Sequence, residues 1–335
     1  SEQQRPCVAF DGTNYLIAWQ NLLNIYGARV SSAGEVLDTT RIPICTATRN
    51  QYGPAVAFDG TNYLVVWTDG RNIQSTDIYG ARVGVDGSVL DASGIAMSTD
   101  MYNQSEPALA FDGTNYLVVW QDVRGGSMEY PDVYGARVSA GGSVLDPLGF
   151  AIAASTGGEE YPAVAFNGDA YHVVWEDHAI DSGDYDINGV RVSPEGTLLD
   201  PDGVALAPSR ARYPDICRGA SSQLLVAYQF YDDLCGCYRI DSTPWSTEVS
   251  GDQEIVPPAS RLCQNYPNPF NAHCTIRYDI SVDGRTRRSR ARRAVTPQRR
   301  PWREHRVPAP RATWCEPATG SALDRSRRDS GTCGR

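Results

Sequence analysis

The chain is organised by a ten-residue phrase, FDGTNYLVVW, which recurs at a nearly fixed interval. Copies occupy residues 10–19, 58–67 and 111–120, a weaker copy occupies 166–175, and a trace remains as QLLVAY at 223–228. A second phrase, YGARV, follows at 26–30, 79–83 and 134–138 and becomes NGVRV at 188–192. Every copy of the first phrase follows a proline, so the repeat starts are marked by Pro6, Pro54, Pro107, Pro162 and Pro214. Self-similarity at such a period indicates one supersecondary unit copied along the chain.

A single copy predicts four short antiparallel strands and no helix. In the second copy, residues 55–58 form an apolar run that ends at a DGTN tetrad typical of a hairpin turn. Residues 63–67 are β-branched and aromatic, with Tyr63, Val65 and Trp67 on one face and apolar residues on the other. A strand with two apolar faces must be covered on both sides. Residues 77–83 predict a third strand and 88–97 a fourth, interrupted at Ser93 and Gly94.

Four-stranded units that cover one another in series predict an all-β chain folded as a β-propeller. We expect about five four-stranded blades, either as a ring or as a fragment of a larger one, and a β-sandwich is the alternative fold. The expected domains are propeller repeats over residues 1–250, a linker at 251–261, the start of a small β domain at 262–284 and a disordered tail at 285–335. The repeats themselves are expected at about 6–53, 54–106, 107–161, 162–213 and 214–250.

Charge is divided sharply along the chain. The tail from residue 285 holds fifteen arginines against four acidic residues, whereas the whole chain carries a net charge of −10, so the rest is strongly acidic. An acidic body does not suit nucleic acid, and no run of residues approaches membrane-spanning length. The tail lacks apolar periodicity and is expected to be disordered, as a basic arm or as the product of an out-of-frame reading. The nine cysteines show no zinc-binding spacing, and the sequence does not indicate whether the protein binds a metal.

A long motif follows the repeats. Residues 262–280 read LCQNYPNPFNAHCTIRYDI, in which X-Pro pairs stiffen a segment before an alternating strand-like stretch. This text resembles the C-terminal sorting domain of the bacterial type IX (Por) secretion system, and the FDGTNYLVVW repeat is similar to repeats of large secreted bacterial proteins. The resemblance implies a secreted or cell-surface protein that contacts the secretion machinery, with export disturbed if the sorting domain is frameshifted. The matching core residues are Gln264, Asn265, Tyr266, Pro267, Asn268, Pro269, Phe270 and Asn271.

Variable loops are the expected place for a ligand. The loops between second and third strands and the links between blades should share one face, and they vary in length and carry carboxylates and tyrosines, which suit sugar hydroxyls, cations or calcium. We select as candidate contacts Glu129, Tyr130, Glu160, Tyr161, Asp177 and Tyr185. The alternative is that the loop aspartates cap turns or pair with Arg71, Arg124 and the YGARV arginines. Asp11, Asp59 and Asp112 of the hairpin turns are expected to be structural.

An enzyme would need residues that depart from the repeat. Glu129, Glu159, Glu160, His172 and His178 do so, but no nucleophile elbow, phosphate loop or metal triad accompanies them, and the separation of two carboxylates cannot be read from a sequence. The sequence therefore favours a non-enzymatic surface binding module for a glycan, a cation or a protein, with no catalytic residues and no cofactor except possible calcium. A glycan-active hydrolase or lyase is the first alternative, and a purely structural surface protein is the second.

Overall fold

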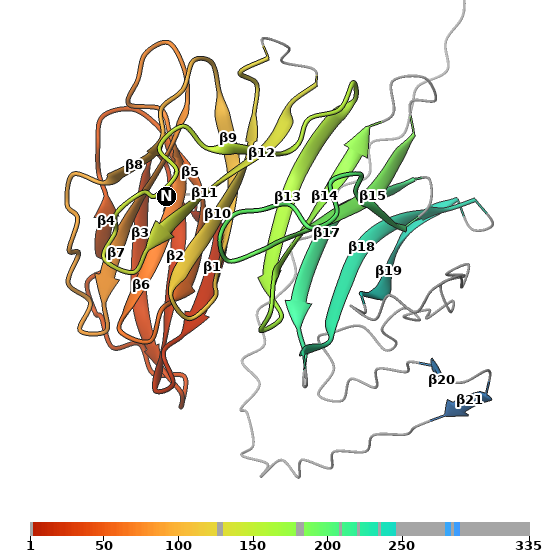
Figure 1. The fold of residues 1–335 in the computed structure, drawn as a ribbon. Helices are drawn as coiled ribbons and strands as arrows, with labels where there is room; N and C mark the ends of the chain where they lie inside the picture. Colours follow the sequence, from red (N-terminus) through yellow and green to blue (C-terminus); the bar gives the residue numbers. More distant parts are fainter. Residues whose placement is uncertain are drawn as a thin grey trace, which may run out of the picture. The chain divides into compact units, whose positions relative to one another are not determined.

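The protein is an all-β propeller built from consecutive small sheets (Figure 1). The computed structural model describes residues 3–125, 130–178, 184–207, 210–219, 222–233, 236–245, 279–282 and 285–288. These residues form four four-stranded sheets, one three-stranded sheet and one two-stranded sheet, all antiparallel, and include no α-helix. Within this described part, no helix has the length and hydropathy needed to cross a membrane. They all belong to a compact unit that spans Ser1–Arg290.

Each blade is a simple meander, with its strands neighbouring one another in chain order. Blade 1 contains β1 (Gln3–Phe10), β2 (Asn14–Asn21), β3 (Asn24–Ser31) and β4 (Ile42–Cys45). Blade 2 contains β5 (Gln51–Phe58), β6 (Asn62–Asp69), β7 (Asp77–Gly84) and β8 (Ile95–Ser98), and blade 3 contains β9 (Gln104–Phe111), β10 (Asn115–Asp122), β11 (Asp132–Ser139) and β12 (Phe150–Ala153). Blade 4 contains β13 (Gly158–Phe166), β14 (Tyr171–His178), β15 (Tyr185–Val192) and β16 (Val204–Ala207), and blade 5 contains β17 (Ala211–Arg218), β18 (Leu224–Asp232) and β19 (Cys237–Trp245).

The predicted fold is confirmed, but the structure differs from the prediction in three details. The fourth strand of blade 2 is β8 alone, because residues 88–94 form no strand and their one β-bridge to the sheet joins Val89 to Val83. Blade 5 has three strands among the described residues rather than four. The hairpin of β20 (Asp279–Val282) and β21 (Arg285–Arg288) spans the border predicted between the small β domain and the disordered tail. The first residues assigned to that tail thus form a strand, and the division into domains otherwise stays a prediction.

The DGTN phrase closes the first hairpin of blades 1, 2 and 3 through its aspartate. Asp59 accepts hydrogen bonds from the backbone N–H groups of Thr61 and Asn62, both at 2.7 Å. Gly60, which lies between Asp59 and Thr61, has a φ of +95°, a backbone conformation that residues with a side chain rarely adopt. Asp11 and Asp112 do the same in blades 1 and 3, and Asn167 replaces them in blade 4. The structural role predicted for the turn aspartates is confirmed.

Neighbouring blades pack face to face through the second strands. Tyr63, Val65 and Trp67 of blade 2 pack with Leu16 and Ala18 of blade 1. The opposite face of β6 packs against the corresponding Tyr-Val-Trp face of β10, and the pattern repeats at the next two interfaces. Trp67 is fully buried, so its predicted scaffold role is confirmed. The two-faced apolar pattern of the repeat is therefore the pattern of blade stacking.

The YGARV arginines are also structural, but their partners differ from those predicted. Arg82 donates from its side chain and its backbone N–H to Asp91, at 2.8 Å and 3.0 Å for the bonds to Oδ2. The pairs Arg29–Asp38, Arg137–Asp146 and Arg191–Asp200 repeat this arrangement. The acceptor is the aspartate of the following hairpin, not a loop aspartate, and the pair ties this hairpin to the third strand.

Candidate functional site

The first strands of consecutive blades contact one another and share a distortion. At the residue before each repeat proline the chain bulges, with register shifts in all five first strands. The φ angle is positive there in every blade, including four residues that are not glycine, and such strain is concentrated at functional sites. These bulge residues, with φ from 50° to 61°, are Arg5, Gly53, Glu106, Tyr161 and Tyr213. The set of bulges is called the axial site below.

The bulges converge because the first strands do. Arg5 of blade 1 forms an ion pair with Glu106 of blade 3 at 2.6 Å, although blade 2 lies between them in the chain. Blade 2 has Gly53 at this position, and a Cβ added to it would lie 3.1 Å from the Arg5 guanidinium. The ion pair is part-exposed, so it contributes little stability, about 0–1 kcal/mol. The ion pair shows, however, that side chains from non-adjacent blades meet at the axial site.

Aromatic rings extend the axial site across blades 4 and 5. The rings of Tyr161 and Tyr213 meet edge to face with centroids 4.9 Å apart. The Arg212 guanidinium lies over the Tyr185 ring, 3.9 Å from its centre. The His178 ring also stacks on Tyr185, with ring centroids 4.5 Å apart, so these rings form a row. Tyr130 continues the row at 6.1 Å from His178. Tyr213 is half-exposed, and Tyr130, Tyr161 and Tyr185 are partly exposed.

A facing pair of glutamates lies beside this row. Glu160 of β13 pairs directly across the ladder with Glu176 of β14, so both side chains project from the same face of blade 4. Glu176 is fully buried and accepts hydrogen bonds from the Arg212 side chain and the Tyr213 N–H, each at 2.9 Å. Burial raises the pKa of Glu160, and the Glu176 carboxylate raises it further, whereas Arg212 and His178 lower it. One carboxyl group is thus biased toward protonation while its neighbour is fixed by two donors.

The preceding rung of the same ladder carries a second acidic pair on the opposite face. Glu159 pairs across the ladder with Asp177, and the Glu159 side chain is fully buried. Its Oε1 accepts hydrogen bonds from the hydroxyl and N–H of Ser155, whereas Oε2 has no partner within the described part of the chain. Burial raises the pKa of Glu159 to about 7, the charges of Asp177 and Asp132 raise it as well, and the Ser155 hydrogen bonds lower it.

The structure gathers most of the residues selected from the sequence. Tyr161 is one of the axial bulges, Tyr130 and Tyr185 belong to the aromatic row, and Glu160 lies beside this row. Asp177 lies apart from them, because the alternation of β14 turns it to the opposite face with Glu159. Glu129 lies outside the described residues, as do the sorting-motif residues 262–278. Ligand binding by the selected residues stays a prediction, and so does calcium. The described residues include no group of three or more acidic, histidine or cysteine side chains placed to hold a metal.

Two residues of blade 5 that contact the glutamate pair were not predicted from the sequence. Arg212 and Tyr213 complete the glutamate pair, but they lie in the copy where the repeat is weakest. The available signal was positional, because Tyr213 precedes Pro214 as Tyr161 precedes Pro162. His172, a candidate base, is fully buried against Trp245 with ring centroids 4.7 Å apart, and burial lowers its pKa to about 4. Its expected role in packing is therefore confirmed.

Among the comparisons with known proteins, the one with solved structures finds similar folds. No protein-family model and no curated protein matches this sequence. A thermostable family-43 glycoside hydrolase is 14% identical, with 77% of this chain and 96% of that chain covered and a TM-score of 0.47. An α-L-arabinofuranosidase from Lactobacillus brevis is 11% identical over 73% of this chain and 91% of its own, with a TM-score of 0.47. An exo-1,5-α-L-arabinanase from a bovine ruminal metagenomic library is 10% identical over 73% and 94%, with a TM-score of 0.44.

Similarity at this level concerns the fold, so chemistry must be argued from the residues of this chain. The prediction of a non-enzymatic binding module, and with it the expectation of no enzyme, is nevertheless corrected. The three solved structures named above are glycoside hydrolases. The sequence could not show the separation of two carboxyl groups, and the register of β13 and β14 places Glu160 directly opposite Glu176. The hydrolase alternative is the one that the site supports.

Proposed function

We propose that this protein hydrolyses glycosidic bonds at the axial site, with Glu160 as the general acid and Glu176 as the facing carboxylate. Glycoside hydrolysis commonly uses two carboxyl groups that flank the scissile bond, one protonated and one ionised. The observation that carries the proposal is the Glu160–Glu176 rung, in which two carboxyl groups share a face but have different surroundings. Environments that separate two acids in this way assign their roles.

The surroundings supply what each role requires. A general acid works best when its pKa lies near the working pH, and burial together with the neighbouring charge moves Glu160 in that direction. Glu176 receives charge-assisted hydrogen bonds from Arg212, whose closest contact is 2.8 Å, and these hold the Glu176 side chain in place opposite Glu160. Tyr161 and Tyr213 provide aromatic faces on which a sugar ring can rest, with phenol groups at their rims.

We also propose that the protein acts outside the cell. The support is the motif at residues 264–271, which resembles the sorting signal of the type IX secretion system. Polysaccharides that are too large to enter a cell are substrates for enzymes at its surface. Fusion of residues 262–335 to a reporter, expressed in a bacterium with that secretion system, tests the export. Retention of the reporter in the periplasm would contradict the extracellular location for this sequence.

The hydrolysis is tested with a panel of polysaccharides and oligosaccharides that includes arabinan and xylan, because an exo-1,5-α-L-arabinanase and a xylan β-1,4-xylosidase are among the similar solved structures. Release of reducing sugar by the wild-type protein is expected for at least one member. Glu160→Gln and Glu176→Gln are expected to lower the rate at least a hundredfold, the usual scale for a general acid. Glycan binding without hydrolysis by the wild type would contradict the proposal.

Glu159→Gln is the matched control. It makes the same chemical change one residue away, on the opposite face of the same strand, and Gln51 and Gln104 occupy this position in blades 2 and 3. Hydrolysis by this variant is expected to match the wild type. Equal losses in Glu159→Gln and Glu160→Gln would point to disturbance of the strand rather than to chemistry at Glu160.

A further inference from the structure

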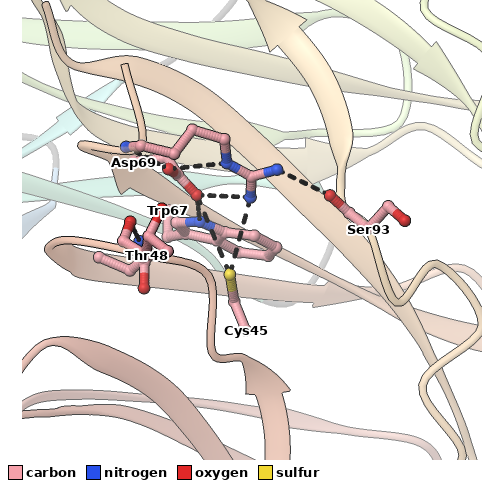
Figure 2. A network of polar contacts seen from close by, with 7 residues as sticks. Cys45, Thr48, Trp67, Asp69 and Ser93 are labelled. Carbon is pink, nitrogen blue, oxygen red and sulfur yellow. Dashed lines mark hydrogen bonds and ion pairs between the residues drawn. The ribbon is translucent and has the colours of Figure 1, made fainter. Parts of the chain in front are cut away.

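Blades 2 and 3 share an internal arginine site. In blade 2, the Trp67 indole N–H and the Arg71 guanidinium both bind the buried Asp69, at 2.8 Å and 2.7 Å for the contacts with Oδ2 (Figure 2). Another nitrogen of Arg71 donates to the Ser93 carbonyl at 2.8 Å, and the guanidinium lies 3.9 Å from the Tyr79 ring centre. The Arg71 guanidinium is therefore held by a carboxylate, a backbone carbonyl and an aromatic ring of its own blade.

Blade 3 repeats the arrangement with different neighbours. Trp120 donates to Asp122 at 2.8 Å, and Arg124 binds the same carboxylate at 2.6 Å. Arg124 also donates to the Leu148 carbonyl at 2.9 Å and lies 3.9 Å from the Tyr134 ring centre. Two independent copies thus show that this blade position is shaped for a guanidinium group.

Blade 4 keeps the tryptophan and the aspartate but lacks the arginine. Trp175 and Asp177 stand where blades 2 and 3 have their tryptophan and aspartate, but the residue four positions after Trp175 is Ala179 rather than arginine. The blade has also gained an acid, because Glu159 occupies the ladder position of Gln51 and Gln104. One positive charge has gone and one carboxyl group has been added at the same place.

A pocket of about 360 Å³ occurs at this place in blade 4, with Ser155, Glu159, Trp175 and Asp177 in its lining. Two buried polar groups at the pocket have no hydrogen-bond partner among the described residues: the indole N–H of Trp175, a residue 4% exposed, and Oε2 of Glu159, a residue 0% exposed. Asp177 bonds instead to the Asn188 amide at 2.8 Å. Buried polar groups are normally paired, and those of native proteins that lack a partner call for an explanation.

We propose that this blade 4 pocket binds the guanidinium group of a ligand, in the position that Arg71 and Arg124 fill from within the chain in blades 2 and 3. The planar guanidinium fork matches a carboxylate in a two-point contact, as Arg71 shows on Asp69. Asp202 lines the pocket and is the counterpart of Ser93 and Leu148, so its carbonyl is expected to accept a further bond. Asn188 replaces the stacking tyrosine, so a bound guanidinium relies on charge and hydrogen bonds.

Charge complementarity supports an organic cation. The lining contains Glu159, Asp177, Asp200 and Asp202, and of these Asp200 is already paired with Arg191 at 2.7 Å. The described residues provide no metal-binding group of three ligands. Glu159 is influenced also by Asp132 across the interface with blade 3, so several like charges favour a cation in the pocket. The site lies on the opposite face of β13 and β14 from Glu160 and Glu176, and it is independent of the proposed hydrolysis.

The test is a titration of the full chain with methylguanidinium, followed through the Trp175 indole N–H signal by NMR and through heat by calorimetry. Saturable binding with a shifted Trp175 signal is expected, and methylammonium, which lacks the planar fork, is expected to bind at least tenfold more weakly. N-acetylarginine amide and free arginine, titrated in parallel, distinguish an arginine side chain from a free guanidino compound as the source. A Trp175 signal that responds to calcium but not to methylguanidinium would overturn the proposal.

Two variants sharpen the result. Glu159→Gln restores the glutamine of blades 2 and 3 and is expected to weaken methylguanidinium binding at least tenfold without harming the fold. Ala179→Arg supplies the missing guanidinium from within the chain and is expected to abolish binding. Unchanged binding in both variants would overturn the proposal.

A created pocket in blade 2 gives the positive control. Arg71→Ala removes the internal guanidinium while Asp69 and Trp67 remain, so methylguanidinium is expected to restore part of the stability that this variant loses. Rescue of Arg71→Ala with no binding to the wild-type blade 4 pocket would show that the blade position accepts the probe but that blade 4 does not, and would contradict the proposal.

Discussion

Glu159→Gln tests the electrostatic account of blade 4 most quantitatively. The Glu159 carboxyl group is fully buried, and burial raises its pKa from the usual 4.5 to about 7. The folded state therefore prefers the protonated acid, and ionisation at neutral pH costs stability. Glutamine has nearly the shape of a protonated glutamate, cannot ionise, and can still accept from the Ser155 hydroxyl.

The magnitude and its sign follow from linkage. Because the folded-state pKa is raised, the stability that Glu159 contributes is fully present below pH 4.5 and is lost as the pH rises through about 7. At 1.36 kcal/mol for each pH unit between the two pKa values, the loss reaches about 3 kcal/mol above pH 7. Glu159→Gln is spared this loss, so it should match the wild type near pH 4 and exceed its stability by about 3 kcal/mol at pH 8.

Urea-induced unfolding of both proteins between pH 4 and pH 8, in buffer free of guanidino compounds, measures the difference. The advantage of Glu159→Gln should grow over the window from 4.5 to about 7 and then level off. An advantage that is independent of pH would show that packing, not ionisation, is responsible. A Glu159→Gln protein less stable than the wild type at pH 8 would refute the reasoning outright.

Three further outcomes follow from the structure. Trp67→Ala should lower the free energy of unfolding by about 3–5 kcal/mol, because the side chain is fully buried between blades 1 and 2, and a loss under about 1 kcal/mol in urea unfolding would contradict that packing. Gly53→Ala should destabilise by about 1 kcal/mol or more, since φ is +61° and the new Cβ would lie 3.1 Å from the Arg5 guanidinium; an unchanged melting temperature would argue against the axial convergence. Tyr130→Ala combined with Tyr161→Ala should weaken glycan binding at least tenfold at unchanged stability, and calorimetry that shows equal affinity would move the sugar surface elsewhere.

The repeat allowed much of the fold to be predicted. Tyr63, Val65 and Trp67 alternate with apolar residues in β6, and this pattern alone required neighbours on both faces. The turn role of Asp59 was also predictable, because a local Asx turn needs no partner from elsewhere in the chain. The partner of Arg82 was not, since Asp91 comes into reach only when the following hairpin folds back on β7.

The candidate site was only half visible in the sequence. Glu160 was selected because it departs from the repeat, and Tyr161 because it is a tyrosine in a variable link between blades. Adjacent strand residues point to opposite faces, however, and the position of Asp177 beside Glu159 depended on the register of β13 and β14. Arg212 joins the site from blade 5, and no local pattern announces a contact between blades. The position before each repeat proline was the available clue, because those five residues are the axial bulges.

The central claim is that Glu160 protonates the leaving group of a glycoside. The most direct measurement compares wild type and Glu160→Ala on two substrates with the same sugar, one with an activated dinitrophenyl leaving group and one with an ordinary sugar leaving group. A good leaving group needs no proton, so the variant should retain most of its activity on the first and lose at least a hundredfold on the second. Equal losses on both substrates, or no loss on the second, would contradict the assignment of Glu160 as the acid.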